Sequence, residues 1–351
     1  MDRLNFKLGN RLVGAKAPCL IIGEVAQAHD GSLGMAHAYI DAIADAGADA
    51  VKFQTHIAAT ESSSEESWRI QFSYQDKSRY DYWERMGFTA EQWWKLKKHA
   101  EERGLIFLSS PFSEAAVDLL SSLGIEAWKV ASGELSNELL INKVLQTHCP
   151  VLISSGMSDI RELDKVTGMC KESGVEYAIL QCTSCYPCPP EKIGINMLPF
   201  LQERYHCPIG LSDHSGTIFA GLAAATLGSN ILEIHVTLSR KMFGPDVSSS
   251  ITDVEMSQLI TGIRFIEEMI NNPVDKQQMA EELISVRKTF TRSVALKNDL
   301  SAGAVIQEED LTLKKPGTGI PPCELQNLIG KRLLKNISAK NLLRYEDVDN
   351  E

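Results

Sequence analysis

The first 270 residues alternate between short apolar runs of strand length and longer stretches in which apolar residues recur at helical spacing. The apolar runs are 19–23, 50–53, 106–108, 127–130, 151–153, 177–180, 209–211 and 231–236. The helices expected between and after them are 35–46, 90–103, 114–123, 137–147, 160–173, 196–204, 218–227 and 252–271. This alternation is typical of a parallel sheet covered by helices. A doubly wound open sheet is one solution, but eight repeats favour closure into a (β/α)8 TIM barrel.

The pattern changes after residue 271, where Asn272-Pro273 breaks the last predicted helix. Residues 272–286 are polar and predict a connector that is largely helical. From residue 287 onward, short strand-like runs alternate with turn residues, which predicts a small second domain. We therefore expect a catalytic barrel over 1–271, a linker over 272–286 and a C-terminal domain over 287–351.

One predicted connection, residues 57–88, is much longer than the loops that usually join a strand to a helix. It begins with an acidic, serine-rich stretch at 61–67 and continues with aromatic residues from Trp68 to Trp83. Long loops that follow a barrel strand are usually functional. We expect this segment to form a lid over the mouth of the barrel.

Composition excludes several classes of protein. The chain has 35 Lys and Arg against 46 Asp and Glu, a formal charge of -11, whereas nucleic-acid binders usually carry a basic excess. No apolar stretch approaches the length of about 18 residues that would suggest a membrane span. The N-terminus lacks the apolar core of a signal peptide, so we expect a cytoplasmic protein that binds neither nucleic acid nor membrane.

The eight cysteines are diluted through the chain, as in a protein of a reducing compartment. The closely spaced Cys182, Cys185 and Cys188, with Cys207 as a fourth, could ligate an iron–sulfur cluster. Free cysteines that simply fill the core are the competing interpretation, and the more common case.

Polar or charged residues close every predicted strand. In a TIM barrel the carboxyl ends of the strands carry the active site, so these side chains are expected to meet at one mouth. The residues at the strand ends are Glu24, Lys52, Gln54, Ser109, Ser110, Lys129, Ser132, Glu134, Ser154, Ser155, Gln181 to Tyr186, Ser212, Asp213, His214, Glu233 and His235.

His214 and His235 end consecutive strands and are expected to be neighbours at the rim of the barrel. Two neutral imidazoles suit a divalent ion, Mn²⁺ first and Mg²⁺ or Co²⁺ as alternatives, although two independent hydrogen-bonded histidines have the same spacing. Asp213 and Glu233 could orient the two imidazoles.

Lys52 and Lys129, with nearby hydroxyl groups, could bind a phosphate or a carboxylate. Glu24 and Glu134 are the candidate acid/base pair. A Schiff-base aldolase with one of the two lysines as nucleophile is an alternative mechanism, which the histidine pair disfavours.

Seven of these segments together resemble the sialic acid synthase (N-acetylneuraminate synthase) family. They read EVAQAHDG (24–31), VKFQTH (51–56), SPF (110–112), WKVASGE (128–134), SGM (155–157), CTSCYP (182–187) and GLSDH (210–214). In the tail, LKKPGTG (313–319) and IGK (329–331) resemble the antifreeze-like (SAF) domain of the same family. The resemblance runs nearly from end to end of the chain.

The resemblance implies condensation of phosphoenolpyruvate with an open-chain 2-acetamido sugar, releasing phosphate and forming a nine-carbon 2-keto acid. It also implies a divalent metal on His214 and His235, and a domain-swapped homodimer in which the SAF domain covers the partner's barrel. The catalytic residues are then Glu24, Glu134 and Lys129. The substrate-binding residues are Lys52, Gln54, Ser110, Ser132, Ser154, Ser184, Tyr186, Ser212, Asp246 and Lys315, of which Gln54 and Asp246 face the sugar.

Four residues depart from the family pattern: Ala28, Ser184, Phe243 and Lys315. Lys315 stands where the bacterial enzymes have an arginine, and a lysine lacks the planar fork that arginine offers to an acetamido group. Ala28 and Phe243 suit a less polar sugar. A legionaminic- or pseudaminic-type synthase is therefore an alternative to a sialic acid synthase. A non-catalytic sugar-binding barrel is the alternative from another class, although such a protein would be expected to lose some of these mouth residues.

Overall fold

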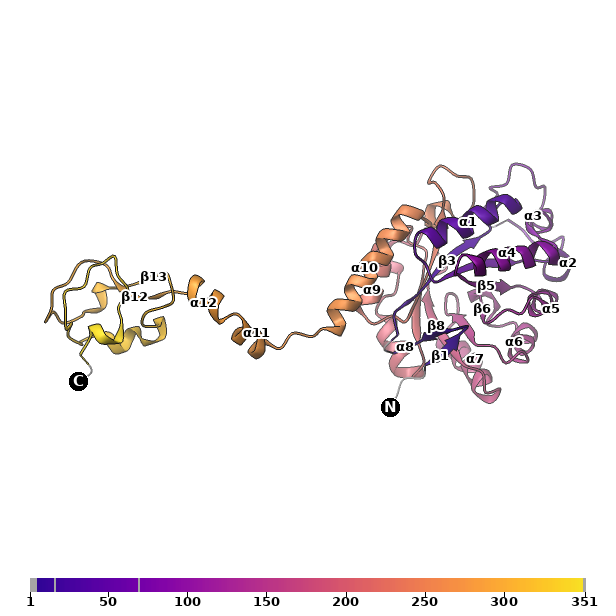
Figure 1. Ribbon diagram of the computed structural model, residues 1–351. Coiled ribbons are helices and arrows are strands. Elements are labelled where there is room, and N and C mark those ends of the chain that lie inside the picture. The colour runs from indigo at the N-terminus through magenta and orange to yellow at the C-terminus, as the bar shows by residue number, and fades with distance from the viewer. Residues whose placement is uncertain (1–4, 16, 69, 350–351) are drawn as a thin grey trace. The chain divides into compact units, whose positions relative to one another are not determined.

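The computed structural model describes residues 5–15, 17–68 and 70–349. The chain divides into two compact units, Met1–Asn271 and Asn272–Glu351 (Figure 1). No helix in these described ranges is both long enough and apolar enough to cross a membrane.

The first unit is built on eight parallel strands, which run in the order β5-β4-β3-β10-β9-β8-β7-β6. They are β3 (Leu20–Ala26), β4 (Ala50–Thr55), β5 (Ile106–Pro111), β6 (Trp128–Val130), β7 (Val151–Ser154), β8 (Tyr177–Cys182), β9 (Ile209–Asp213) and β10 (Ile231–Thr237). The end strands β5 and β6 pack against each other, which brings the sheet round into a nearly closed barrel. The short strand β11 (Ile251–Thr252) pairs in parallel with the end of β10. The predicted TIM barrel is confirmed.

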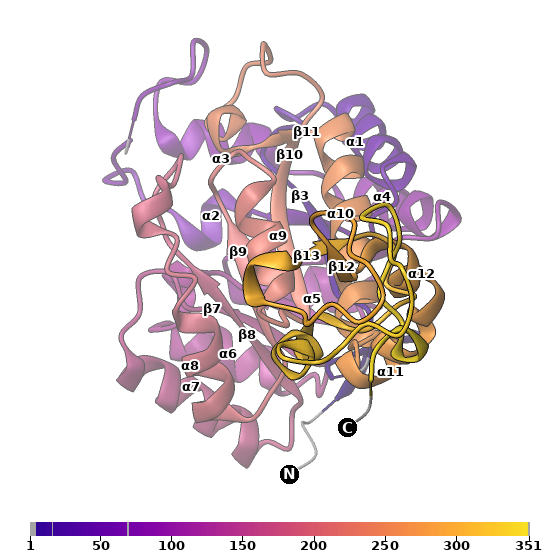
Figure 2. The same ribbon diagram turned by 90° about the vertical axis from the view of Figure 1, so that its left-hand side faces the viewer.

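Helices surround the barrel in both views (Figures 1 and 2). They are α1 (Leu33–Asp45), α4 (Ala90–Glu102), α5 (Glu114–Ser122), α6 (Glu138–Leu145), α7 (Ile160–Glu172), α8 (Met197–Tyr205), α9 (Phe219–Thr226) and α10 (Asp253–Asn271). Their starts follow the sequence: Ser113, for example, accepts a hydrogen bond from the Ala116 amide and caps α5. Apolar residues between these helices and the strands make the main core.

The inside of the barrel changes from apolar to polar along the strands. Because side chains alternate between the two faces of a strand, residues two apart point into the barrel at successive heights. The lower layer is apolar and includes Leu20, Ile22, Leu108 and Leu152. An antiparallel hairpin, β1 (Phe6–Leu8) and β2 (Arg11–Val13), packs on this layer and closes the bottom of the barrel.

The 57–88 segment has structure of its own. It contains α2 (Ala58–Glu61) and α3 (Arg79–Met86), and most of its aromatic residues form a separate apolar cluster with Ala58 and Met86. Arg85 ties it down by donating hydrogen bonds to Asp76 and to the side chain and carbonyl of Asp30. The sequence predicts a long loop here, and the structure adds two short helices and a core to it.

The second unit begins with two short helices, α11 (Lys276–Glu282) and α12 (Ile284–Phe290). Their residues are almost all exposed. The helix α12 continues beyond the predicted linker to Phe290. An antiparallel pair, β12 (Ser293–Leu296) and β13 (Leu311–Lys314), then packs with irregular segments around a small core that includes Val294, Ile306 and Leu343.

Candidate active site

Four charged side chains form a layer inside the barrel, directly above the apolar layer. Glu24, Lys52, Lys129 and Glu233 come from β3, β4, β6 and β10, and each is at most 4% exposed. Lys52 Nζ lies 2.7 Å from Glu24 Oε2 and 3.7 Å from Glu233 Oε2. Lys129 Nζ lies 3.5 Å from Glu233 Oε1. Two ammonium groups therefore balance two carboxyl groups in this layer.

Serine hydroxyl groups complete the contacts of the charged layer. Lys129 donates to Ser154 Oγ at 2.5 Å, and Lys52 lies 3.4 Å from Ser110 Oγ. Ser212 donates to Glu233 Oε1 at 2.9 Å. The structure thus brings the predicted anion-binding lysines together with three of the predicted serines.

Burial and pairing act in opposite directions on the carboxyl groups of this layer. Burial raises the pKa of Glu24, although Lys52 opposes the change. Burial also acts to raise the pKa of Glu233, but the nearby charges of Lys129 and Lys52 lower it overall. Glu24 is therefore the more easily protonated of the two carboxyl groups.

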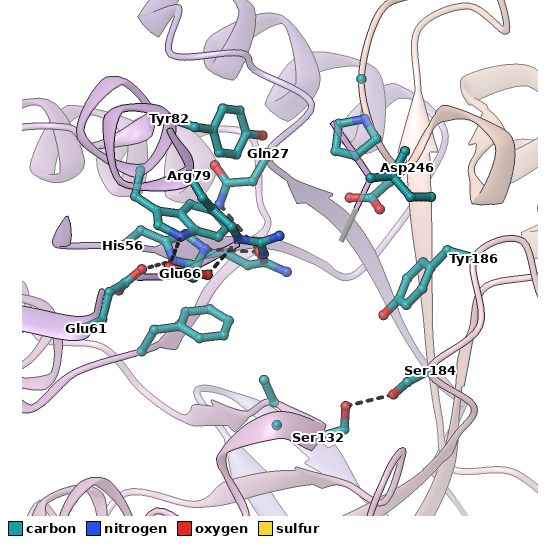
Figure 3. A pocket seen from close by; sticks show the side chains of 18 of the residues that line it. Gln27, His56, Glu61, Glu66, Arg79, Tyr82, Ser132, Ser184, Tyr186 and Asp246 are labelled. Atoms are coloured by element: carbon teal, nitrogen blue, oxygen red, sulfur yellow. Dashed lines mark hydrogen bonds and ion pairs between the residues drawn. The ribbon is translucent and has the colours of Figure 1, made fainter. Parts of the chain in front are cut away.

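A cavity of about 660 Å³ lies at the carboxyl ends of the strands, and it brings the predicted mouth residues together with the 57–88 segment (Figure 3). Its predicted members are Gln54, Ser132, Glu134, Ser184, Tyr186, His235 and Asp246. From the 57–88 segment come Glu61, Glu66, Ile70, Phe72, Arg79, Tyr82 and Trp83. The segment therefore forms part of the cavity wall. Whether it moves as a lid stays a prediction.

Gln54 connects the cavity to the charged layer. It lines the cavity, and its Nε2 donates to Glu24 Oε1 at 3.3 Å. Across the cavity, the hydroxyl groups of Ser132 and Ser184 lie 3.1 Å apart. Glu134 also lines the cavity and accepts a hydrogen bond from Asn137; burial raises the pKa of its carboxyl group. The two predicted acid/base glutamates thus occupy different depths.

His214 and His235 are neighbours, with ring centroids 5.2 Å apart. Burial lowers the pKa of His214 to about 3 and that of His235 to about 4, so both rings are neutral at physiological pH. His214 Nδ1 donates to the Thr183 carbonyl oxygen at 3.1 Å, which leaves Nε2 as its lone-pair nitrogen. This pair fits a divalent ion that takes its other ligands from water and substrate. No group of three or more His, Cys, Asp or Glu in the described ranges is arranged to hold a metal, and the iron–sulfur alternative stays a hypothesis.

One predicted residue does not belong to the barrel unit. Lys315 is in the second unit, where its Nζ stands 5.4 Å from the centroid of the Phe290 ring. Sequence reasoning also underestimated Glu233, which we considered only as a partner of the imidazoles and which in fact contacts both lysines. It missed the cavity residues Gln27 and Arg79. The aromatic content of the 57–88 segment was the available signal for that wall.

The fold and the site define a class: a (β/α)8-barrel enzyme with a buried charged layer beneath a cavity at the carboxyl ends of its strands. The model of the NeuB family matches residues 39–275, and the model of the SAF domain matches residues 291–349. The chain belongs to the NeuB family. The predicted family and the C-terminal SAF domain are confirmed.

Three known proteins show the extent of the likeness. The chain is 31% identical over 344 residues to the N,N′-diacetyllegionaminic acid synthase of Legionella pneumophila, covering 96% of each. It is 32% identical over 346 residues to the N-acetylneuraminate-9-phosphate synthase of Homo sapiens, covering 97% of this chain and 95% of that protein. The structure of the N-acetylneuraminic acid (sialic acid) synthetase of Leptospira borgpetersenii, in complex with citrate, aligns with a TM-score of 0.72 at 26% identity, covering 82% of this chain and 98% of that one.

Proposed function

We propose that this chain condenses phosphoenolpyruvate with an open-chain 2-acetamido sugar to give a nine-carbon 2-keto acid and inorganic phosphate. The observation that carries this proposal is the buried pair of lysines beneath a cavity large enough for a sugar. The relatives support the same class of reaction, since their names are those of nonulosonate synthases.

The phosphoenolpyruvate would lie lowest, with its anionic groups toward Lys52 and Lys129 and the surrounding hydroxyl groups. Charged hydrogen bonds from ammonium and hydroxyl groups suit a phosphate and a carboxylate. The hydroxyl groups assigned to this substrate belong to Ser110, Ser132, Ser154, Ser184, Tyr186 and Ser212. The open-chain sugar would occupy the cavity above, against Gln54 and Asp246.

The reaction forms a bond between carbon 3 of phosphoenolpyruvate and the aldehyde carbon of the sugar. The aldehyde oxygen takes up a proton, and carbon 2 becomes electron-deficient. A water molecule adds at carbon 2 and loses a proton. Cleavage of the bond between carbon 2 and the phosphate ester oxygen then releases phosphate and leaves the keto group. Glu24 and Glu134 are the proposed acid and base, because burial raises the pKa of both carboxyl groups toward neutrality.

His214 and His235 are the proposed ligands of a divalent metal, Mn²⁺ first, with Mg²⁺ or Co²⁺ as alternatives. When bound, such an ion supplies Lewis acidity that polarises the sugar aldehyde. The contribution of the chain itself is the orientation of two neutral imidazoles, one of them fixed by the Thr183 carbonyl.

A homodimer with exchanged SAF domains is part of this proposal. Nearly all residues from 272 to 292 are exposed, and the helices α11 and α12 carry large apolar side chains such as Ile284 and Phe290, which are 51% and 66% exposed. Lys315 would then act on the active site of the partner subunit.

The sugar itself has two candidates. The apolar cavity residues Ile70 and Phe72, with Phe243 packed 6.1 Å from Phe72, favour a 6-deoxy diacetamido sugar of the legionaminic or pseudaminic type over N-acetylmannosamine. A phosphate-release assay over a panel of 2-acetamido sugars, with mass analysis of the product, decides between them. Absence of phosphate release with every sugar would instead favour a non-catalytic sugar-binding barrel.

A further inference from the structure

His56 links the 57–88 segment to the floor of the cavity. It directly follows β4 and is 6% exposed. Its ring lies between two aromatic rings, with Trp83 of α3 stacked at 3.8 Å on one side and Phe112 at 4.3 Å on the other, both at an interplanar angle of 16°. Trp83 is fixed in turn, because its Nε1 donates to Glu66 Oε2 at 3.1 Å. The plane of the His56 imidazole is therefore set from both faces.

Both nitrogens of His56 face oxygen atoms. Nδ1 donates to Glu61 Oε1 at 2.6 Å, and the other carboxylate oxygen of Glu61 accepts from the Ile57 amide at 3.1 Å. Nε2 lies 3.3 Å from Gln54 Oε1, and because both partners are oxygen acceptors, the ring serves both only when each of its nitrogens carries a hydrogen. Figure 3 shows His56, Glu61 and Gln27 on the same side of the pocket. The contacts of Glu61 with Nδ1 and with the Ile57 amide hold the ring in the orientation in which Nε2 points at Gln54.

The contact to Gln54 has a consequence for the neighbouring carboxyl group. A carboxamide has an oxygen on one side and an NH₂ group on the other, so turning it by 180° exchanges an acceptor for a donor. A donor at His56 Nε2 holds the oxygen of Gln54 toward His56, and Gln27 Nε2 reaches the same oxygen at 3.4 Å. The NH₂ group is then directed to Glu24 Oε1, and Glu24 Oε2 stays on Lys52.

We propose that His56 is a positioning residue. It fixes the orientation of the Gln54 carboxamide, and through it that of the Glu24 carboxyl group, so that both are placed to meet the sugar. The inference rests on the proposed function, because it assigns His56 a role in binding that sugar. Glu61, Trp83 and Phe112 serve to aim the ring. This arrangement makes the packing of the 57–88 segment part of the sugar site, since Glu61 and Trp83 both belong to that segment.

The test compares two variants that differ only at residue 56. In Glu61→Gln, the new amide donates to Nδ1, so the neutral ring still donates from Nε2 to Gln54. In Glu61→Gln with His56→Phe, the aromatic stack is kept, no buried charge loses its partner, and the donor to Gln54 is lost. The single variant sets the reference KM for the sugar, because it keeps the donor at Nε2. The double variant should raise that KM about tenfold, with the KM for phosphoenolpyruvate nearly unchanged.

A double-mutant cycle separates positioning from general packing. In the Glu61→Gln background, Gln54→Ala should raise the KM for the sugar at least as much as His56→Phe does, and the two changes together should add nothing further. Additive effects would show that His56 acts elsewhere. If Glu61→Gln alone raised the KM for the sugar as much as the double variant does, the charge of the His56–Glu61 pair, and not the orientation of the ring, would be what matters. Either result overturns the proposal.

Crystal structures of the two variants keep this test separate from the proposed function. The carboxamide of Gln54 should keep its wild-type orientation in Glu61→Gln. It should lose that orientation in the variant that also carries His56→Phe. If the wild-type protein releases no phosphate with any sugar, the proposed reaction fails, but these structures still report on Gln54. An unchanged Gln54 in both variants would overturn the positioning role.

Discussion

Lys52 contacts both carboxyl groups of the buried layer, so its charge should matter for stability as well as for substrate binding. Lys52→Met shortens the side chain by one atom, keeps it unbranched, and leaves Glu24 and Glu233 with one ammonium group instead of two. Removing one partner from a buried ion pair costs about 3–5 kcal/mol of unfolding free energy. Chemical denaturation measures this loss, and phosphate release should disappear with it.

Lys95→Met is the matched control for that variant. Lys95 pairs with Glu91 at 2.6 Å, but their side chains are 51% and 76% exposed. An exposed pair of this kind contributes at most about 1 kcal/mol. If Lys52→Met were as mild as Lys95→Met, the buried layer would not have the energetic role given to it here.

The two histidines give a second prediction at the residue scale. A variant with His214→Ala and His235→Ala should lose both tight binding of Mn²⁺, measured by calorimetry, and phosphate release. Chelation of the wild-type protein should abolish phosphate release, and added Mn²⁺ should restore it. His37→Ala on α1 is the control and should keep both properties. Retention of Mn²⁺ binding in the double variant would place the metal elsewhere.

At the scale of elements, the Asp76–Arg85 pair joins the loop before α3 to α3 within the 57–88 segment, and Arg85 also reaches Asp30 outside it. The hydrogen bonds from Arg85 outweigh burial and hold the pKa of Asp76 below its ordinary value of 3.8. A carboxyl group whose pKa is lowered on folding stabilises the fold above its ordinary pKa, and that contribution is lost as the pH falls through the folded value. Asp76→Asn should therefore speed hydrogen exchange in α3 about tenfold at pH 7.

The difference in the exchange rate of α3 between Asp76→Asn and the wild type should shrink on acidification, because the carboxyl group of the wild type also becomes neutral. Glu84→Gln, an exposed position on the same helix, serves as the control and should leave the exchange unchanged. A difference between Asp76→Asn and wild type that persisted below the folded pKa would show that the asparagine acts through packing instead.

The sequence predicted best those elements whose signal is local, that is, a run of apolar residues of the right length and spacing. The buried runs at 177–180 and 209–211 needed only apolar residues of strand length, and both are strands. The hairpin β1–β2 gave no such signal, because three-residue strands are too short to show a period and are held by the barrel floor they cover. The helices α2 and α3 also depend on tertiary contacts, namely the cluster around Trp83.

The site shows a similar division. Polar residues at strand ends identified Lys52, Lys129 and Glu24, because the barrel brings strand ends together whatever the loops do. The stacked rings around His56 could not be predicted, because Trp83 and Phe112 lie 27 and 56 residues further along the chain and meet His56 only through the fold.

At the scale of the whole molecule, the proposed exchange of SAF domains would build each active site from two chains. Lys315→Ala and the variant with both histidines replaced by alanine should each be nearly inactive. Coexpressed in equal amounts, they should form mixed dimers in which one site holds both an intact histidine pair and an intact Lys315. Random pairing then restores about a quarter of the wild-type phosphate release. Absence of any restoration would contradict the exchange, and light scattering gives the oligomeric state independently.

The hairpin at the bottom of the barrel also bears on the order of events during turnover. With β1 and β2 packed on the lower layer, the charged layer is approached from the cavity side. In the proposed arrangement phosphoenolpyruvate takes the deepest position, so it has to bind before the sugar, which would then cover it. Initial-rate patterns should therefore show compulsory sequential addition, and an unreactive sugar analogue should inhibit uncompetitively against phosphoenolpyruvate. Substrate binding in this barrel would then be ordered from the deepest position outward.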